Sequence, residues 1–511
     1  MKSRISRIIL ILIGISTASY VYAQCQCTAP PPQSASVTTY HNDALRTGWN
    51  QKETFLTASA FPSAFGFRHT ISVDDQVDAQ PLFMSGLSIA GGMHDVVYAV
   101  TESNTVYAID AATGFILVSR NLGTAVPNPL GCSNNPPNIG TTGTPVIDPS
   151  SGIMYLITYL NNGPTYQIHA IDILTLQDRI SPVTVSASHK LTDGSTLNFN
   201  PSVQRQRAAL LLQDGIVYAG FASFCDFAAN QSRGWVLGWN AGNLAPIASN
   251  ELTDQLASGG FFLSSVWMSG YGLAGTAQQI FFTTGNSASG TYTGTTNIQE
   301  SAVGLNEGTF TISQLFTEPN HDSLDSVDED FGSGGLMLLP DQVGSVPHLA
   351  VAAGKDGILY FFNRDFFNTP IASYSAGGGC WCGPSYFVGS DGVPRIVTSQ
   401  GSTLKIWRVN LSSPPTLSSA FSKGISTGQD PGFFTSLSSN GTASGSAIIW
   451  VIRRGNPLIL DAYNPSSLVQ LFSSSAGQYP FGGGNANQVP TVANGRVYVG
   501  AYKSLTIFGA N

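Results

Sequence analysis

The densest group of possible metal ligands is an acidic run, Asp-Ser-Leu-Asp-Ser-Val-Asp-Glu-Asp, from Asp322 to Asp330. Its carboxylates alternate with other residues somewhat as in a calcium-binding loop, because Ca²⁺ prefers oxygen ligands. The spacing is irregular and no helix–loop–helix surrounds it, which favours a solvated loop. The seven histidines show no metal-type pairing. The sequence also lacks a Gly-x-Ser-x-Gly elbow, a phosphate-binding loop and a zinc-protease motif.

The cysteines offer a second kind of chemistry. Two Cys-x-Cys pairs could bind a soft metal, but no neighbouring histidine completes such a site. An even number of cysteines in an oxidising compartment favours disulfides, whose connectivity the sequence does not give. The six cysteines are Cys25, Cys27, Cys132, Cys225, Cys380 and Cys382.

The N-terminus predicts that the chain is exported, to the periplasm or the extracellular space. Basic residues at 2, 4 and 7 precede the apolar run Ile8–Ile15, and Val21-Tyr22-Ala23 provides a cleavage site before Gln24. We therefore expect a signal peptide over residues 1–23, a Pro-rich linker over 24–37 and one domain over 38–511. No later stretch is long enough for a membrane-spanning helix.

The charge balance argues against a nucleic-acid partner. Signal cleavage removes three of the 22 basic residues and no acidic ones, which leaves 19 against 30 and a net charge near −11. Phosphate binding needs a basic face. Charged residues make up only 10% of the chain, and glycine is abundant. This composition is typical of an exported all-β protein with many tight turns.

A repeated strand motif must position any functional residues. An alternating strand ends in a small or aliphatic residue followed by Asp or Asn and a turn, most clearly over 104–114 and 166–175. Eight copies recur with a mean step of about 57 residues, which suits a four-stranded blade. We therefore predict an all-β fold with a single eight-bladed β-propeller. The equivalent positions are 108, 170, 238, 304, 361, 406, 462 and 507.

The two ends of this repeat array predict how the ring closes. The chain stops soon after the eighth copy, so the last blade lacks an outer strand, which His69–Val73 could supply. The polar segment 40–48 is expected to cover one face of the ring, and no chemistry is assigned to it. Asp110 and Asp172 end repeat strands, and we interpret them as turn-closing residues.

The motif Ala108-x-Asp110-x-x-Thr113-Gly114 resembles the repeat of the pyrroloquinoline quinone (PQQ) binding-like propellers. That family includes the eight-bladed quinoprotein alcohol dehydrogenases. It binds the quinone on the propeller axis beside a calcium or lanthanide ion. The tryptophan that often ends the family's repeat is replaced here by Val118 and Ile180, so the blades would be locked differently.

The resemblance implies several site residues. Asn286, in Phe-Thr-Thr-Gly-Asn, matches the amide that ligates the metal, and Asp226 falls where the family has a metal-ligating glutamate. Lys355, in Gly-Lys-Asp-Gly, matches the basic residue that contacts the quinone oxygens, and Trp267 matches the floor under the quinone ring. Each of these residues also has a purely structural interpretation. Asn286 and Lys355 could lie in ordinary turns, and Trp267 could be a core residue.

Two departures weigh against catalysis. Asn306 stands where the resemblance places the catalytic aspartate, also near the metal, and an amide cannot take a proton from an alcohol. Glu307, Asp328 or Asp330 could substitute only with a shifted geometry. The family also stacks its quinone on a disulfide between adjacent cysteines. The nearest equivalent in this sequence is the pair Cys380 and Cys382, which a tryptophan separates and which belongs to a different blade.

These observations leave two hypotheses. The favoured one is a binding or scaffold propeller with a degenerate dehydrogenase site, whose partner is an unknown protein, glycan or small molecule. The alternative is a PQQ- and calcium-dependent oxidoreductase that acts on an alcohol or a sugar. The first hypothesis is favoured by Asn306 and by the absence of an adjacent-cysteine disulfide. The alternative is favoured by four residues, Asn286, Asp226, Lys355 and Trp267.

Overall fold

The fold is described from a computed structural model, which covers residues 36–132, 136–226, 228, 230–252, 264–379, 383–426, 432–481 and 487–510. These residues lie in one compact unit, Ser34–Asn511. The predicted signal peptide, most of the linker, and Cys25, Cys27, Cys380 and Cys382 lie outside the described residues. In these ranges, no helix combines the length and apolar character that crossing a bilayer requires.

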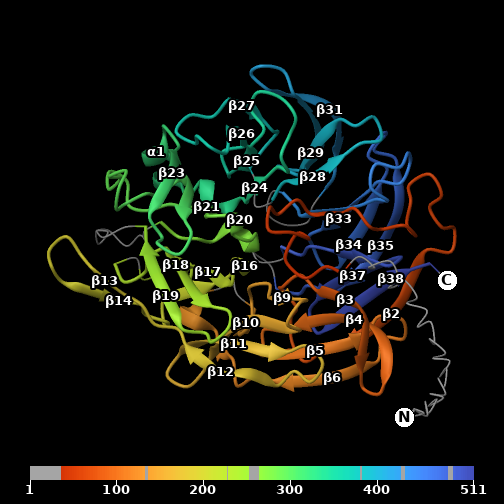
Figure 1. Ribbon diagram of the computed structural model, residues 1–511, viewed down its shortest axis with the longest axis horizontal. Helices are drawn as coiled ribbons and strands as arrows, with labels where there is room; N and C mark the ends of the chain where they lie inside the picture. The colour runs from red at the N-terminus through yellow and green to blue at the C-terminus, as the bar shows by residue number, and fades with distance from the viewer. Residues whose placement is uncertain are drawn as a thin grey trace, which may run out of the picture. The chain divides into compact units, whose positions relative to one another are not determined.

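Eight of the sheets formed by the described residues are the blades of a propeller (Figure 1). This confirms the predicted fold. The strands of these blades are antiparallel except where the short β1 (Trp49–Asn50) pairs with β32 (Thr435–Ser438). Blade 1 consists of β3 (Leu82–Ile89), β4 (Gly92–Val100), β5 (Thr105–Asp110) and β6 (Ile116–Asn121), and blade 2 of β9 (Val146–Asp148), β10 (Ile153–Leu160), β11 (Thr165–Asp172) and β12 (Asp178–Thr184). Blade 3 consists of β15 (Gln204–Gln206), β16 (Leu211–Gln213), β17 (Ile216–Ser223), β18 (Trp235–Asn240) and β19 (Pro246–Glu251). Blade 4 consists of β20 (Ala274–Thr276), β21 (Gln279–Thr284), β22 (Ser301–Asn306) and β23 (Ile312–Thr317).

The second half of the ring repeats this arrangement. Blade 5 consists of β24 (Leu336–Leu338), β25 (Leu349–Ala353), β26 (Ile358–Asn363) and β27 (Ala372–Ser375), and blade 6 of β28 (Ser385–Val388), β29 (Pro394–Thr398), β30 (Thr403–Asn410) and β31 (Thr416–Gly424). Blade 7 consists of β32 (Thr435–Ser438), β33 (Ile448–Arg453), β34 (Leu458–Tyr463) and β35 (Gln470–Gly477), with β1 (Trp49–Asn50) beside β32. Blade 8 consists of β36 (Thr491–Ala493), β37 (Arg496–Ala501), β38 (Ser504–Gly509) and β2 (Gly66–Ser72).

Short elements connect the blades. They are β7 (Val126–Pro127), β8 (Asn138–Ile139), β13 (Ser188–Lys190), β14 (Thr196–Asn198), α1 (His321–Val327) and the 3₁₀ turns η1 (Pro129–Gly131), η2 (Met268–Gly270) and η3 (Phe331–Ser333).

Ring closure occurs as predicted, through the N-terminal part of the chain. The strand β2 pairs antiparallel with β38 (Figure 1). In this pair, His69 lies opposite Ile507. The observed strand spans Gly66–Ser72, so it begins three residues before the predicted one and ends one residue earlier. The outer strand of blade 8 therefore comes from the start of the domain, and this covers the edge of β38.

The repeat motif forms buried strands with structured ends. Alternation in Val106 and Ala108 places small and branched side chains between adjacent sheets, where both are fully buried. At the strand end, the Asp110 carboxylate accepts hydrogen bonds from the backbone N–H groups of Ala112 and Thr113, at 3.0 and 2.6 Å. Asp172 closes the next copy in the same way. Both aspartates thus have the predicted turn-closing role.

The segment Val37–Asn50 makes hydrogen bonds to all eight blades. Most of these bonds join its backbone to the inner strands, for example from Gly275 N–H in β20 to the carbonyl of Ala44 (2.8 Å). The Arg46 guanidinium reaches the carbonyl of Leu210 beside blade 3 (2.9 Å), and Asn50 reaches that of Val492 in blade 8 (2.7 Å). The predicted face-covering role of this segment is confirmed. The other blades are bonded through Phe83, Ile147, Leu338, Tyr386 and Leu437.

Candidate metal centre

Polar and charged residues from three neighbouring blades gather at one end of the propeller. Asp226 follows β17, Asn286 follows β21, and Lys355 follows β25, while Asp328 and Asp330 lie in the connection from β23 to β24. Equivalent strands of successive blades run in the same direction, so the loops after them gather at one face.

This face is opposite to the one covered by the segment Val37–Asn50. That segment bonds to Gly275 and Leu338, which lie toward the turns that lead into β21 and β25. Asn286 and Lys355 follow the other ends of those same strands.

Asp330 is at the centre of the polar contacts. One of its carboxylate oxygens, Oδ2, lies 2.5 Å from Lys355 Nζ, and the other accepts a hydrogen bond from the backbone N–H of Asn286 at 2.9 Å. Lys355 Nζ also donates to the backbone carbonyl of Asp328 (2.8 Å), and the Asn286 side-chain amide donates to Asp328 Oδ1 (3.1 Å). The loops of blades 4 and 5 are thereby joined.

Several buried oxygen atoms at this face lack a hydrogen-bond donor within the described part of the chain, and two of them lie next to the Asp330–Lys355 pair. Asn286 Oδ1 belongs to a side chain that is 1% exposed, and Glu300 Oε1 to one that is fully buried. The other Glu300 oxygen accepts from the backbone N–H of Phe331 at 2.6 Å. A buried polar atom without a partner is costly, and a hard cation would satisfy such oxygens.

The electrostatics show an excess of negative charge. Burial, reinforced by Asp330 and Asp328, raises the pKa of Asp226 to about 8. Burial and Asp330 also raise the pKa of Glu300 well above its usual value. Burial alone would raise the pKa of Asp330, but the ammonium of Lys355 holds it below the usual value. Four carboxyl groups, counting Asp328, thus face one ammonium.

The structure brings three of the sequence-predicted residues together, namely Asp226, Asn286 and Lys355. It does not bring Asn306 to them. Asn306 pairs with Gln279, at the end of β22 that is distant from Asn286, and its exposed side chain donates to Thr311. The six-residue strand spans roughly 16 Å. Asn306 is therefore a turn residue like Asp110, because the repeat motif ends at the opposite end of the blade.

Asp328 and Asp330, rather than Asn306, lie beside Asn286 and Lys355. Asp328 and Asp330 were expected to need a shifted geometry, and the β23–β24 connection provides it. Glu300 was missed entirely. The only signal for it was an acidic residue directly before a strand that is apolar and buried on both faces, Ser301–Asn306.

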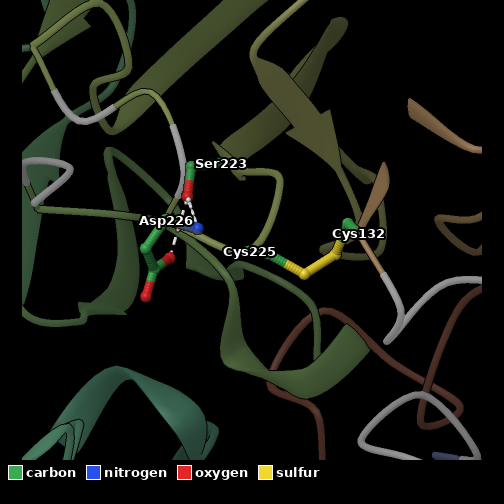
Figure 2. Close-up of a disulfide and its surroundings, with 4 residues drawn as sticks. All are labelled: Cys132, Ser223, Cys225 and Asp226. Atoms are coloured by element: carbon green, nitrogen blue, oxygen red, sulfur yellow. Dashed lines mark hydrogen bonds between the residues drawn. A yellow bond between two sulfur atoms is a disulfide. The ribbon is translucent and has the colours of Figure 1, made fainter. Parts of the chain in front are cut away.

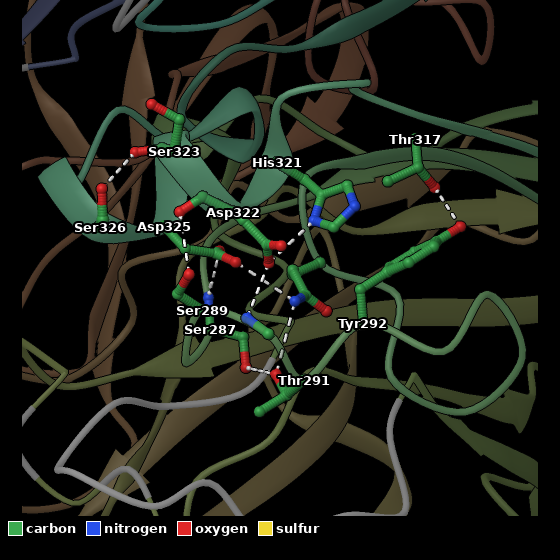
Figure 3. Close-up of polar contacts among 12 residues, drawn as sticks. Ser287, Ser289, Thr291, Tyr292, Thr317, His321, Asp322, Ser323, Asp325 and Ser326 are labelled. Atoms are coloured by element: carbon green, nitrogen blue, oxygen red, sulfur yellow. Dashed lines mark hydrogen bonds and ion pairs between the residues drawn. The ribbon is translucent and has the colours of Figure 1, made fainter.

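The acidic run is not a wholly solvated loop, which corrects the prediction. Its first part forms α1, and Asp325 on this helix is buried, where it accepts from the backbone N–H of Ser287 (2.9 Å) and from Gln299 Nε2 (3.2 Å) (Figure 3). The helix therefore packs its acidic face on the loop after Asn286. Ligand atoms of His321, Asp322 and Asp325 lie within 4.8 Å of one another, but Asp322 is exposed.

Trp267 occupies the loop before β20, which is bonded to the Asn286 loop through Gly285 N–H and the carbonyl of Ser265 (2.9 Å). The guanidinium carbon of Arg205 lies 4.8 Å from the centre of the Trp267 ring. Arg205 is 1% exposed, and its charge interacts with buried Glu102 and Asp78. One face of the tryptophan is therefore covered by a guanidinium, so a quinone would not fit against that face in this arrangement.

A disulfide lies directly beside the site. Cys225 precedes Asp226 and is bonded to Cys132, with a Cα–Cα distance of 5.6 Å (Figure 2). Asp226 Oδ1 also accepts a hydrogen bond from Ser223 Oγ at 2.9 Å. The Cys132–Cys225 bond confirms that the chain forms a disulfide. Its two cysteines are 93 positions apart, unlike the adjacent cysteines on which the quinoprotein dehydrogenases stack their quinone.

Comparison with known proteins shows the fold and not the family. No family model matches the chain, and no curated protein matches it. Among solved structures, quinohemoprotein alcohol dehydrogenase from Comamonas testosteroni is 12% identical and covers 94% of this chain and 81% of its own, with a TM-score of 0.64. A europium-containing methanol dehydrogenase is 12% identical, with coverage of 91% and 90% and a TM-score of 0.61. BamB from Moraxella catarrhalis is 14% identical, with coverage of 87% and 99% and a TM-score of 0.51.

These similarities place the chain with propellers of the quinoprotein dehydrogenase type in fold. At such low identity, they do not transfer an activity, a cofactor or a partner.

Proposed function

We propose that this chain is a cation-binding propeller, whose metal centre is formed by Asp226, Asn286, Glu300, Asp328 and Asp330 beside Lys355. The observation that carries the proposal is the pair of buried oxygens without donors, Asn286 Oδ1 and Glu300 Oε1. Oxygen ligands at a site rich in carboxylates favour a hard cation, calcium or a lanthanide, at oxygen distances of about 2.3–2.6 Å. A bound cation would also neutralise the excess negative charge.

Terbium luminescence tests this proposal. Tb³⁺ replaces calcium at oxygen sites and emits when a nearby aromatic residue is excited. We expect saturable binding with one strong site, and at least tenfold weaker binding in Asn286→Ala and Glu300→Gln. Asn306→Ala is the matched control, because it removes an amide of the same type from the opposite end of the blade. Equal binding by all three variants and the wild type would contradict the proposal.

A quinoprotein oxidoreductase is the second candidate, and the Lys355–Asp330 pair favours it. Lys355 holds the pKa of Asp330 below its usual value, so this carboxylate stays ionised and can receive a proton from a substrate hydroxyl. The same lowered pKa makes it a weak base, which opposes this candidate. Its proton acceptor would be Asp330 rather than residue 306. The guanidinium over Trp267 opposes this candidate. Dye reduction by alcohols or sugars after incubation with PQQ and calcium, lost in Asp330→Asn, would establish it.

We further propose that the chain acts after export, in the periplasm or outside the cell. The disulfide Cys132–Cys225 supports this, because such bonds persist in oxidising compartments. A secreted product beginning at Gln24, identified by mass spectrometry, is the expected result. A cell-associated product that retains Met1 would contradict it.

A further inference from the structure

The backbone at Cys225 and Asp226 has an unusual conformation for side-chain-bearing residues. Both have positive φ angles, 50° and 58°, in the left-handed region. Two consecutive residues of this kind persist only where the surroundings hold them. Here the turn directly follows β17, and it directs the Asp226 carboxyl toward the charges of Asp330 and Lys355.

Two fixed points hold this turn. Ser223 Oγ, at the end of β17, accepts the backbone N–H of Asp226 (3.2 Å) and donates to its carboxylate (2.9 Å). The disulfide joins Cys225 to Cys132, which lies at the end of η1 and is 1% exposed (Figure 2). The second fixed point therefore belongs to the connection between blades 1 and 2, and not to blade 3 itself.

The disulfide thus restrains the one centre residue that lacks any other long-range covalent or hydrogen-bonded support in the described chain. Asn286 and Asp330 support each other through a backbone hydrogen bond, and Lys355 is held by Asp328 and Asp330. Within the described chain, the hydrogen bonds of Asp226 are all made with Ser223, three residues away.

We infer that the disulfide Cys132–Cys225 is a positioning element for Asp226, and that it sets the cation affinity of the metal centre. The inference rests on the proposed cation site. Without the disulfide, Cys225 and Asp226 relax toward ordinary backbone angles, and the carboxylate leaves the cluster. Oxidation of the two thiols would then be coupled to cation binding.

The test is a double-mutant cycle on the full chain, with Tb³⁺ alone as the probe. The pair Cys132→Ser/Cys225→Ser removes the disulfide and leaves the other cysteines unchanged. In the chain that keeps Asp226, we expect removal of the disulfide to lower the Tb³⁺ affinity about tenfold. In an Asp226→Asn background, where the carboxylate is already absent, we expect removal of the disulfide to change the affinity by less than about twofold.

The possible outcomes separate a positioning role from a merely structural one. An equal loss in both backgrounds, or no loss in the Asp226 background, would overturn the inference. If the wild type itself does not bind Tb³⁺, the proposed cation site fails instead. Should the serine pair not fold, the alanine pair and brief reduction of the folded wild type, followed by alkylation, provide the same comparison.

Discussion

Lys355 Nζ lies 2.5 Å from Asp330 Oδ2, and this ion pair connects blade 5 to the loop that enters it. Among the described residues of this cluster, Lys355 is the one ammonium beside four carboxyl groups. It keeps Asp330 ionised, while the pKa values of Asp226 and Glu300 are raised, so these two carboxyl groups resist ionisation in the absence of a cation.

Cation affinity should rise with pH. The pKa of Asp226 is about 8 because of burial and the neighbouring Asp330, so at neutral pH the carboxyl is mostly protonated in the cation-free protein. Binding must then displace a proton, and affinity should increase up to tenfold per pH unit below about 8 and level off above it. Calorimetry in buffers of different ionisation enthalpy measures the released proton. Asp226→Asn should reduce this pH dependence and the number of protons released, and Glu300 and Asp328, whose pKa values are also raised, account for what remains.

The cation-free protein should lose stability as pH rises. For a carboxyl whose pKa is raised on folding, the native state binds more protons than the unfolded state between the two pKa values. The pKa values of Asp226 and Asp328, about 8 and about 6, define a window from roughly pH 4 to 8 in which stability falls. Urea unfolding at pH 5.5 and 8 should show a lower midpoint at pH 8. Excess calcium should reverse the difference, and a pH-independent midpoint would contradict it.

Arg205→Ala should uncover the ring of Trp267. The guanidinium covers one ring face at 4.8 Å, and alanine cannot reach it. We expect PQQ with calcium to quench tryptophan fluorescence more in this variant than in the wild type, with tighter binding by at least tenfold. Trp267→Phe in the same background should abolish the signal. Equal quenching in wild type and Arg205→Ala would show that the arginine does not exclude the quinone.

Arg46→Ala should strongly destabilise the propeller. The Arg46 side chain is fully buried and donates to the carbonyls of Leu273, Leu210 and Tyr40 at 2.8–2.9 Å. Buried acceptors left without a donor cost about 1–3 kcal/mol each, so we expect a loss of about 3 kcal/mol or more in the free energy of unfolding. Chemical denaturation measures it. The half-exposed Arg179, replaced by alanine, is the control and should cost less than about 0.5 kcal/mol.

The fold could be predicted because each blade repeats the same local signals. Hairpin glycines, alternating strands and a terminal Asp or Asn recur at a regular step, so eight weak copies support one another. The closing strand could be predicted because the last repeat, around Ile507, has no outer strand of its own after it in the sequence. The contacts of Val37–Asn50 with every blade could not be predicted in detail, because they use backbone groups whose partners have no sequence signature.

The metal centre could be predicted only in part, for a geometric reason. Asn286 and Lys355 lie in short turns after strands, where a local motif fixes the position of the side chain. Asp330 lies in a long connection between blades, and Glu300 lies before a strand, so neither has a fixed offset from the repeat. Asn306 was misplaced because its repeat position lies at the opposite end of the strand from Asn286.

The pairing of β2 with β38 also determines when the ring can be completed. The residues that seal the last blade are among the first of the domain to be synthesised, and their partners, around Ile507, are the last. Contacts between such distant parts of a chain slow folding, because the whole loop must be closed before they form. The nascent chain must therefore keep Gly66–Ser72 unpaired until the final strand has emerged. A truncation that removes β38 would leave this strand as an exposed edge, open to pairing between molecules.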